Sequence, residues 1–231
     1  MSQFNVNQSV GEIVTLMPKA SEVFKKYEID FCCGGNKALG EVIQAQGLDE
    51  VKILTELDEV FEQTKFLQGD IDFTQMASID LVDYIIDTHH GYLRRALPEI
   101  SSYVTKILQV HGAHHKELFN VHKLFHLLKM DLEQHILKEE MSLFPLIQEY
   151  DENPNQELLT KIKRELVDTE AEHDGAGDII KELRKITNGF TTPEDGCRTY
   201  FITYEKIKEL ESDLFQHIHL ENNILFNRFE D

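Results

Sequence analysis

Basic residues, cysteines and long apolar runs are all scarce in this chain of 231 residues. Only 23 lysines and arginines stand against 42 aspartates and glutamates, which gives a formal net charge of −19. Without a basic stripe the chain cannot displace counterions from phosphates, so no nucleic-acid partner is expected. The apolar runs fall short of the roughly 18 residues that a membrane-spanning helix needs. We therefore expect no membrane partner either.

Three cysteines, two of them adjacent, are too few and too unevenly placed for a disulfide framework, and they indicate reduced thiols. The first ten residues carry neither the basic flank nor the apolar stretch of a signal peptide. Both observations predict a cytoplasmic location. With 41% hydrophobic residues, the chain can bury a core as one large domain or two small ones.

Breaks in the helical pattern divide the chain near residue 70. Residues 1–67 predict a small N-terminal helical domain, 68–77 a connector, and 78–231 a second domain. Within the first domain, helical stretches are expected at about 8–17, 18–28, 35–46 and 48–66. Proline and glycine separate these stretches, because neither residue continues a helix well.

Four long helical patterns fill the second domain, at about 79–110, 115–150, 156–188 and 193–229. Gly112, Asn153-Pro154-Asn155 and Asn188-Gly189 separate them, and Thr192-Pro193-Glu194 has the composition of a helix start. Four helices of this length joined by short loops predict an antiparallel four-helix bundle. The expected fold class is therefore all-α, with a kink at Pro98.

Histidines and glutamates lie on the apolar faces of these four helices. Leucines and isoleucines at helical spacing place six such residues toward the core: His90, His135, Glu139, His173, His217 and Glu221. His89 is turned about 100° from the core stripe. The same helical geometry turns three other histidines away from the core, and we expect His122, His126 and His219 at the surface.

The second domain contains an internal repeat. His135-Ile136-x-x-Glu139-x-x-x-Leu143-Phe144 recurs 82 residues later as His217-Ile218-x-x-Glu221-x-x-x-Leu225-Phe226, and His173 follows His90 by 83 residues. A duplicated helical hairpin places two equivalent half-sites opposite each other in a bundle core. Two equivalent half-sites predict two metal ions.

The cost of burying polar groups favours metal binding over a packed core. A single inward histidine is most often a hydrogen-bonded core residue, but four imidazoles and two carboxylates are expensive to bury without partners. Nitrogen and oxygen ligands without thiolate suit iron, manganese or zinc, and shared carboxylates favour iron. If both glutamates bridge, each ion has two imidazoles and two carboxylate oxygens. A bridging oxo or hydroxo group would then leave one open position for oxygen, nitric oxide or a peroxide.

Several acidic residues near these ligands are candidate partners for the histidine rings, although each is more often a surface charge. The candidates one turn before a ligand are Asp87, Asp131, Glu170 and Asp213. Glu170 also leaves open a site richer in carboxylates, of ferritin type. Glu172 is a candidate for an access path to the metals.

The chain resembles the family of repair-of-iron-centres proteins of the ScdA and YtfE type. The resemblance covers nearly the whole chain and depends on these motifs: Asp30-Phe31-Cys32-Cys33-Gly34-Gly35, His90, His135-x-x-x-Glu139, His173, and His217-x-x-x-Glu221-Asn222-Asn223-x-Leu225-Phe226. It implies a haemerythrin-like bundle in which the six matching histidines and glutamates hold a di-iron centre. Asn227 departs from the proline common at that place in the family, but it touches no proposed ligand.

The resemblance also implies a role in repairing iron-sulfur clusters damaged by nitrosative or oxidative stress. The expected partners are damaged cluster proteins and small ligands such as nitric oxide or oxygen, and the family suggests a homodimer. Nothing in the sequence commits the chain to catalytic turnover. A haemerythrin-like oxygen or nitric-oxide carrier or sensor without repair activity is the alternative, and a ferritin-like oxidase is disfavoured by the nitrogen-rich ligands.

The adjacent cysteines favour the repair role over the carrier or sensor, because a plain oxygen or nitric-oxide carrier does not need them. Cys32 and Cys33 precede a helical stretch, where thiols have lowered pKa values, so they are candidates for redox exchange, nitrosyl handling or docking to a damaged protein. An ordinary pair of reduced cysteines in a turn is the alternative. Cys197 is expected to be a small packing residue.

Overall fold

The structure, a computed structural model, describes residues 3–64 and 71–229. Within these residues the regular structure is helical apart from an isolated bridge between Ser9 and Ala38. The chain forms two compact units, Met1–Ala77 with Ile218–Asp231, and Ser78–His217. The sequence assigned all of 78–231 to one domain, whereas contacts group its last stretch with the N-terminal residues. The first part of the predicted connector, 68–70, lies outside the described residues.

Short helices make up the N-terminal part of the first unit: α1 (Val10–Leu16), α2 (Ala20–Lys26), α3 (Leu39–Gln46) and α4 (Glu50–Thr64). Ser9 and Glu12 form a capping box that fixes the start of α1. Gly47 ends α3 with a φ of 65°, a left-handed conformation that glycine adopts without strain. These helices lie within or close to the four stretches that the sequence predicts.

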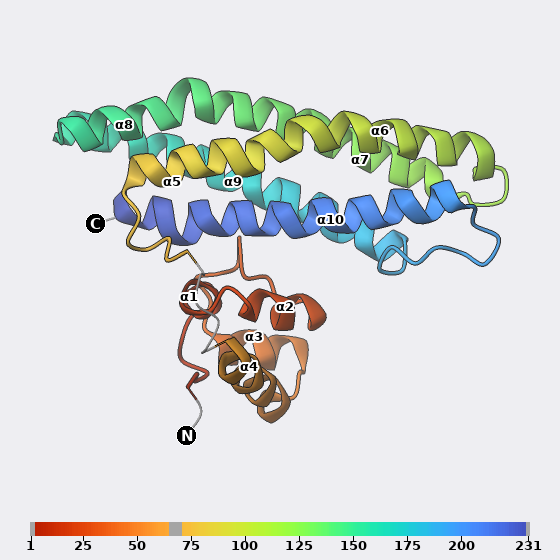
Figure 1. The fold of residues 1–231 in the computed structure, drawn as a ribbon, viewed down its shortest axis with the longest axis horizontal. Coiled ribbons are helices and arrows are strands. Elements are labelled where there is room, and N and C mark those ends of the chain that lie inside the picture. The colour runs from red at the N-terminus through yellow and green to blue at the C-terminus, as the bar shows by residue number, and fades with distance from the viewer. Residues whose placement is uncertain (1–2, 65–70, 230–231) are drawn as a thin grey trace. The chain divides into compact units, whose positions relative to one another are not determined.

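Long helical runs form the bundle (Figure 1). The first three are α5 (Ser78–Ile85), η1 (Ile86–His90) and α6 (Gly91–His111); α7 (Glu117–Lys138), η2 (Glu139–Leu143) and α8 (Phe144–Glu152); and α9 (Gln156–Ile186). The last is α10 (Arg198–Leu220), followed without a break by η3 (Glu221–Leu225) and η4 (Phe226–Phe229). The predicted all-α fold with a C-terminal bundle is confirmed.

Neighbouring runs are joined by apolar packing and by ion pairs. Helix α7 packs between α6 and α9, and α10 is tied to α9 by Arg184 and Glu211 and to α6 by Lys206 and Glu99. Pro98 lies inside α6, as predicted. Among the described residues, no helix has both the length and the apolar character needed to cross a membrane.

The start of the last run differs from the prediction. Thr192-Pro193-Glu194 does not open a helix, because α10 begins five residues later than expected, at Arg198. Pro193 instead occupies a turn that its carbonyl closes by accepting the N–H of Gly196 at 2.8 Å. A proline preceded by threonine and followed by acids suits both a turn and a helix start, so composition alone does not separate them.

Candidate metal centre

Three turns of π-helix occur in the bundle runs, each next to a predicted ligand. Turn η1 ends at His90, η2 begins at Glu139, and η3 begins at Glu221. Turns η2 and η3 are separated by the same 82 residues as the sequence repeat. A π turn accommodates one extra residue and changes the direction of the side chains around it, which is why such turns are frequent at functional sites.

The structure brings the six predicted ligand side chains into two groups that share both glutamates. In each group, one potential ligand atom per residue lies within 4.8 Å of every other: His90, Glu139, His217 and Glu221 in the first, and His135, Glu139, His173 and Glu221 in the second. All six side chains are buried. Each group therefore offers two imidazole nitrogens and two carboxylates to one cation.

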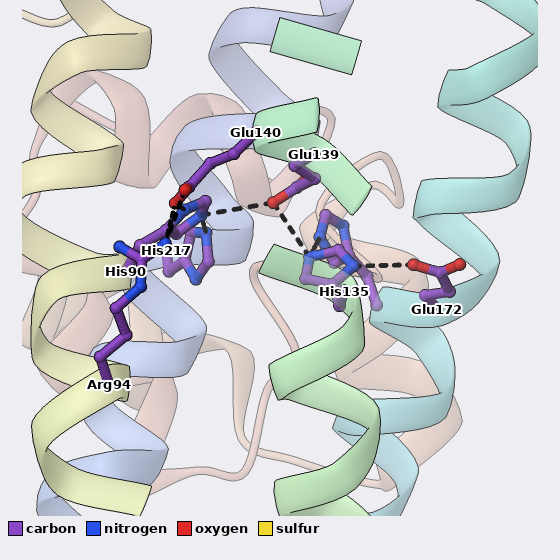
Figure 2. A network of polar contacts seen from close by, with 8 residues as sticks. His90, Arg94, His135, Glu139, Glu140, Glu172 and His217 are labelled. Carbon is purple, nitrogen blue, oxygen red and sulfur yellow. Dashed lines mark hydrogen bonds and ion pairs between the residues drawn. The ribbon is translucent and has the colours of Figure 1, made fainter. Parts of the chain in front are cut away.

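Distances within the groups agree with ligand positions around two cations. The Nε2 atoms of His90 and His217 are 3.2 Å apart, and those of His135 and His173 are 3.1 Å apart. Two atoms at right angles around a cation, each bonded at about 2.1 Å, are about 3 Å apart. Oε2 of Glu139 lies 3.3 Å from Nε2 of both His90 and His135. Figure 2 shows this carboxylate between His90 and His217 on one side and His135 on the other, the position of a bridging ligand.

Surface carboxylates fix the tautomers of two of these histidines. Nδ1–H of His90 donates to Glu140 at 2.7 Å, and Nδ1–H of His135 donates to Glu172 at 2.9 Å (Figure 2). A neutral imidazole that donates from Nδ1 has its lone pair on Nε2. The lone pairs of His90 and His135 are therefore directed toward the Glu139 carboxylate, an arrangement that a cation between them stabilises.

Basic residues hold these two carboxylates in place. Arg94 donates to both oxygens of Glu140 at 2.6 Å, and Lys138 donates to Glu172 at 2.7 Å. Burial raises the pKa of Glu140, but the hydrogen bonds from Arg94 and His90 outweigh it and lower the pKa overall. The hydrogen bond from His135, assisted by Lys138, lowers the pKa of Glu172 to about 2. Both carboxylates are therefore anionic and strengthen the imidazoles as ligands.

Glu139 provides the test of whether these residues suit a metal. Its side chain has no exposed area, and neither carboxylate oxygen has a hydrogen-bond partner. An anionic carboxylate buried in this way is unstable unless it is paired or bound to a metal. The site's nitrogen and oxygen donors, without thiolate, fit iron, manganese or zinc. The residues present therefore fit a metal centre.

Of the predicted ring partners, Asp213 was wrong. Asp213, one turn before His217, binds His89 instead, with Oδ1 3.0 Å from Nδ1, and Asp87 is exposed. His89 is itself buried, and its ring stacks on that of His217 with centroids 5.4 Å apart. Glu140 had no signal in the sequence, because it contacts a histidine 50 residues away on another helix.

A cavity of about 610 Å³ lies beside the second histidine pair. His135 and His173 line it together with Glu172, Lys138 and the exposed Met141. Glu172, the residue that the sequence suggested for an access path, thus lies at this cavity and also holds His135. A small ligand can approach the proposed metal positions from this side.

The adjacent cysteines occupy a fixed turn in the first unit. Asp30 Oδ1 accepts the N–H groups of Cys32 and Gly34, each at 3.1 Å, and the Cys32 thiol at 3.3 Å. Cys32 is buried and Cys33 is half-buried. The thiol hydrogen bond with Cys33, then burial, raises the pKa of Cys32. The predicted lowering of the Cys32 pKa is therefore wrong, because the thiol is shielded from water and faces a carboxylate.

The C-terminal stretch of the first unit packs on this turn. Asn223 donates to the carbonyl of Cys32 at 3.0 Å, and His219 Nδ1 donates to the carbonyl of Phe31 at 3.4 Å. His219 is buried, and burial lowers its pKa to about 4. The surface position predicted for His219 is therefore wrong. The helical face opposite the ligands was assumed to face solvent, but here it contacts Phe31.

Two other expectations concerned smaller features. His122 and His126, which were expected at the surface, are half-buried, and their rings are tilted by 47° with centroids 4.2 Å apart. Cys197 is exposed and not a packing residue, since it lies in the loop before α10. His111 Nε2 is 3.2 Å from its Sγ. This contact lowers the pKa of Cys197 to about 7.

Comparison with known proteins agrees with this arrangement. Residues 6–60 match the ScdA_N model, described as a domain of unknown function (DUF542). Residues 81–229 match the haemerythrin HHE cation-binding domain. Similar proteins include the iron-sulfur cluster repair protein ScdA of Staphylococcus haemolyticus, 31% identical, with 95% of this chain and 96% of the relative covered. The chain belongs to the ScdA and YtfE family of iron-sulfur cluster repair proteins.

Other members of the family are similarly close. The iron-sulfur cluster repair protein YtfE of an Enterobacter species is 35% identical, with 96% of both chains covered. A probable iron-sulfur cluster repair protein of Haemophilus influenzae is 34% identical over the same shares. The cation-binding match covers all six clustered histidines and glutamates, so the bundle of this family member is a metal-binding domain.

Proposed function

We propose that this chain is a di-iron protein that takes part in the repair of iron-sulfur clusters damaged by nitrosative or oxidative stress. One observation carries the proposal: two pairs of buried histidines share two buried glutamates, one of which lies between the pairs. The names of its relatives support repair as the role. The proposed ligands are His90 and His217 for one iron, His135 and His173 for the other, and Glu139 and Glu221 as bridges.

An iron pair would supply redox chemistry and positions for small ligands such as nitric oxide or oxygen. The protein's part is to orient the ligands and to limit access. Glu140 and Glu172 hold the rings of His90 and His135, and Phe144 stacks on His90 with centroids 5.7 Å apart. Because the six ligand side chains are buried, small uncharged ligands reach them more easily than ions do. A homodimer stays a prediction from the family resemblance, and a cytoplasmic location stays a prediction from the sequence.

The metal centre is tested by growing the protein on the Mössbauer-active iron isotope and measuring iron content and spectra. We expect two irons per chain as a magnetically coupled pair in the wild type and in Glu133→Gln, a matched control. Glu133 lies on the same run, exposed and paired with Lys129. Glu139→Gln and His135→Ala should lose the pair. A single iron, or a pair that survives both substitutions, contradicts the ligand assignment.

Repair is tested with an iron-sulfur dehydratase inactivated by nitric oxide. The iron-loaded wild type should restore dehydratase activity without added free iron, and Glu139→Gln should not. If the wild type binds iron and nitric oxide but restores no activity, the haemerythrin-like carrier or sensor becomes the better description. The two measurements therefore separate metal binding from repair.

A further inference from the structure

A third group of potential metal ligands lies in the first unit, formed by Asp30, Cys32 and Cys33. We propose that these residues form a mononuclear site for a divalent transition-metal ion that accepts thiolates, separate from the histidine centre. The assignment of iron(II) as its natural cation rests on the proposed repair function, which requires iron to be handled. Metal binding by the three side chains does not depend on that function.

The distance between the two sulfur atoms already matches that of two thiolates bound to one metal ion. The Sγ atoms of Cys32 and Cys33 are 3.9 Å apart. Two thiolates bonded at about 2.3 Å to a tetrahedral cation are about 3.8 Å apart. Asp30 Oδ1 lies 3.3 Å from Cys32 Sγ, so a carboxylate oxygen is present on the same side of the pair. One cation can therefore be bound by all three side chains with small movements.

Backbone hydrogen bonds hold the carboxylate in this position before any metal binds. The N–H groups of Cys32 and Gly34 both donate to Asp30 Oδ1. They orient the side chain toward the thiols and reduce the entropy that would be lost on ligation. Cys33 is half-buried, which gives a cation and a fourth ligand from solvent or a partner a route to the site.

Hydrogen bonds to two of its carbonyl groups also hold this turn in place. Asn223 donates to the Cys32 carbonyl, and Gly11 donates its N–H to the Gly35 carbonyl at 2.7 Å. A Cβ atom at Gly35 or Gly11 would overlap the Asn223 side chain, so both positions require glycine. These contacts fix the backbone of the turn. A rigid backbone that carries one buried and one half-buried thiol forms a preorganised binding site.

Cobalt(II) is the probe for the first test, because a thiolate ligand gives a near-ultraviolet charge-transfer band that imidazole and carboxylate ligands do not. Full-length protein with its bundle already loaded with iron is titrated with cobalt(II) without oxygen. We expect the band to saturate at one equivalent. The doubly substituted Cys32→Ser, Cys33→Ser protein should lack it, and Cys197→Ser, the matched control, should keep it.

Asp30→Asn distinguishes the carboxylate ligand from a structural role. Asparagine keeps the Oδ1 acceptor for both N–H groups but removes the charge, so the turn should fold while cobalt(II) affinity falls about tenfold or more. No band in the wild type, a band that persists in the double serine variant, or unchanged affinity in Asp30→Asn would overturn the proposal.

Two further samples separate this inference from the proposed function. Glu139→Gln should lose the bundle iron and still show the cobalt-thiolate band. Wild-type protein given excess iron(II) should show an additional ferrous Mössbauer component that the double serine variant lacks. If the bundle binds iron and repair proceeds but no band forms, only the cysteine site is refuted. If the band forms but the bundle binds no iron, only the proposed function is refuted.

Discussion

At the scale of single residues, two histidine rings of the proposed metal centre are bound by carboxylates that lie outside the ligand groups. Glu140 and Glu172 accept the Nδ1 protons of His90 and His135, and Arg94 and Lys138 hold them from the solvent side. We call each set of a basic side chain, a carboxylate and a ligand histidine an arm, and the two arms are alike in chemistry. Each arm should therefore raise metal affinity without touching the metal.

Replacing Glu140 with glutamine tests this arrangement. The amide oxygen still accepts the His90 proton, but the loss of charge weakens the imidazole as a ligand, so iron affinity should fall about tenfold. Affinity is measured by competition with a coloured chelator. Glu99→Gln serves as the control, because Glu99 pairs with Lys206 on the bundle surface. Equal affinity in both variants would show that the Glu140 arm has no effect on the metal.

Cys197 gives a prediction on pH dependence. Its pKa is about 7, with the hydrogen bond from His111 as the largest cause. Only the thiolate reacts with iodoacetamide, so its alkylation rate should rise with pH to a midpoint near this value. His111→Ala should move the midpoint upward, toward that of an ordinary thiol. Mass spectrometry of the peptide containing Cys197 measures the rate, and an unchanged midpoint would rule out the influence of His111.

That the six candidate ligands would lie close together was predictable from sequence, because their positions are local properties of a helix. Apolar residues at helical spacing identify the face on which His90 lies, and the repeat identifies the equivalent His173. Partners of the ligands were not predictable in this way. Glu140 binds a histidine on another helix. Asp213 binds His89 and not His217, which is nearer in the sequence. These contacts depend on how one helix is rotated relative to another, which the spacing of residues in the sequence does not specify.

At the scale of elements, the contact between α9 and α10 depends on a charged pair. Arg184 donates from Nε at 2.7 Å and from a second nitrogen to the carboxylate of Glu211, which is buried. Removing one partner leaves the other charge buried, at a cost of roughly 3 kcal/mol. We expect Arg184→Met to lower the free energy of unfolding by this amount, measured by urea denaturation. The double variant Arg184→Met, Glu211→Leu should recover most of the loss, whereas additive losses would contradict the pairing.

The limits of helix prediction are also visible at this scale. Glycine, proline and asparagine mark most helix boundaries, and the sequence places these correctly. The π turns were not foreseen, because one additional residue shifts an apolar pattern by only 100° and the pattern is read over several turns. Turn η2 nevertheless begins at Glu139, one of the candidate ligands. The geometry of the centre thus depends on a detail finer than hydrophobic periodicity.

At the scale of the whole molecule, metal binding should contribute to stability. Glu139 is buried without hydrogen bonds, and a bound cation would compensate its charge. An ion present at 1,000 times its dissociation constant stabilises the folded state by about 4 kcal/mol. We expect metal removal by a chelator to lower the melting temperature by roughly 10 °C. Glu139→Gln combined with Cys32→Ser and Cys33→Ser should melt at the same temperature with and without chelator; a metal-dependent shift in this variant would place the stabilising ion elsewhere.

The sequence identified the all-α class, the bundle and the family, because these follow from patterns that extend over many residues. It did not predict that the last stretch would group with the N-terminal residues. A linear division assigns each residue to the domain before or after one connector. Residues 218–231 are the last in the sequence, far from residues 1–77, yet Asn223 and His219 bind the turn that contains the cysteines.

This shared final stretch constrains how members of the family can exchange parts. Gly11 and Gly35 accommodate Asn223, and Glu221, two residues earlier, belongs to the ligand groups of the bundle. A chimera that takes only residues 1–77 from a relative would join a foreign cysteine turn to a native Asn223. Recombination therefore preserves the contact between Asn223 and the cysteine turn only when residues 218–229 travel with the N-terminal segment. Homologous genes should show correlated substitutions between these two distant regions of the chain.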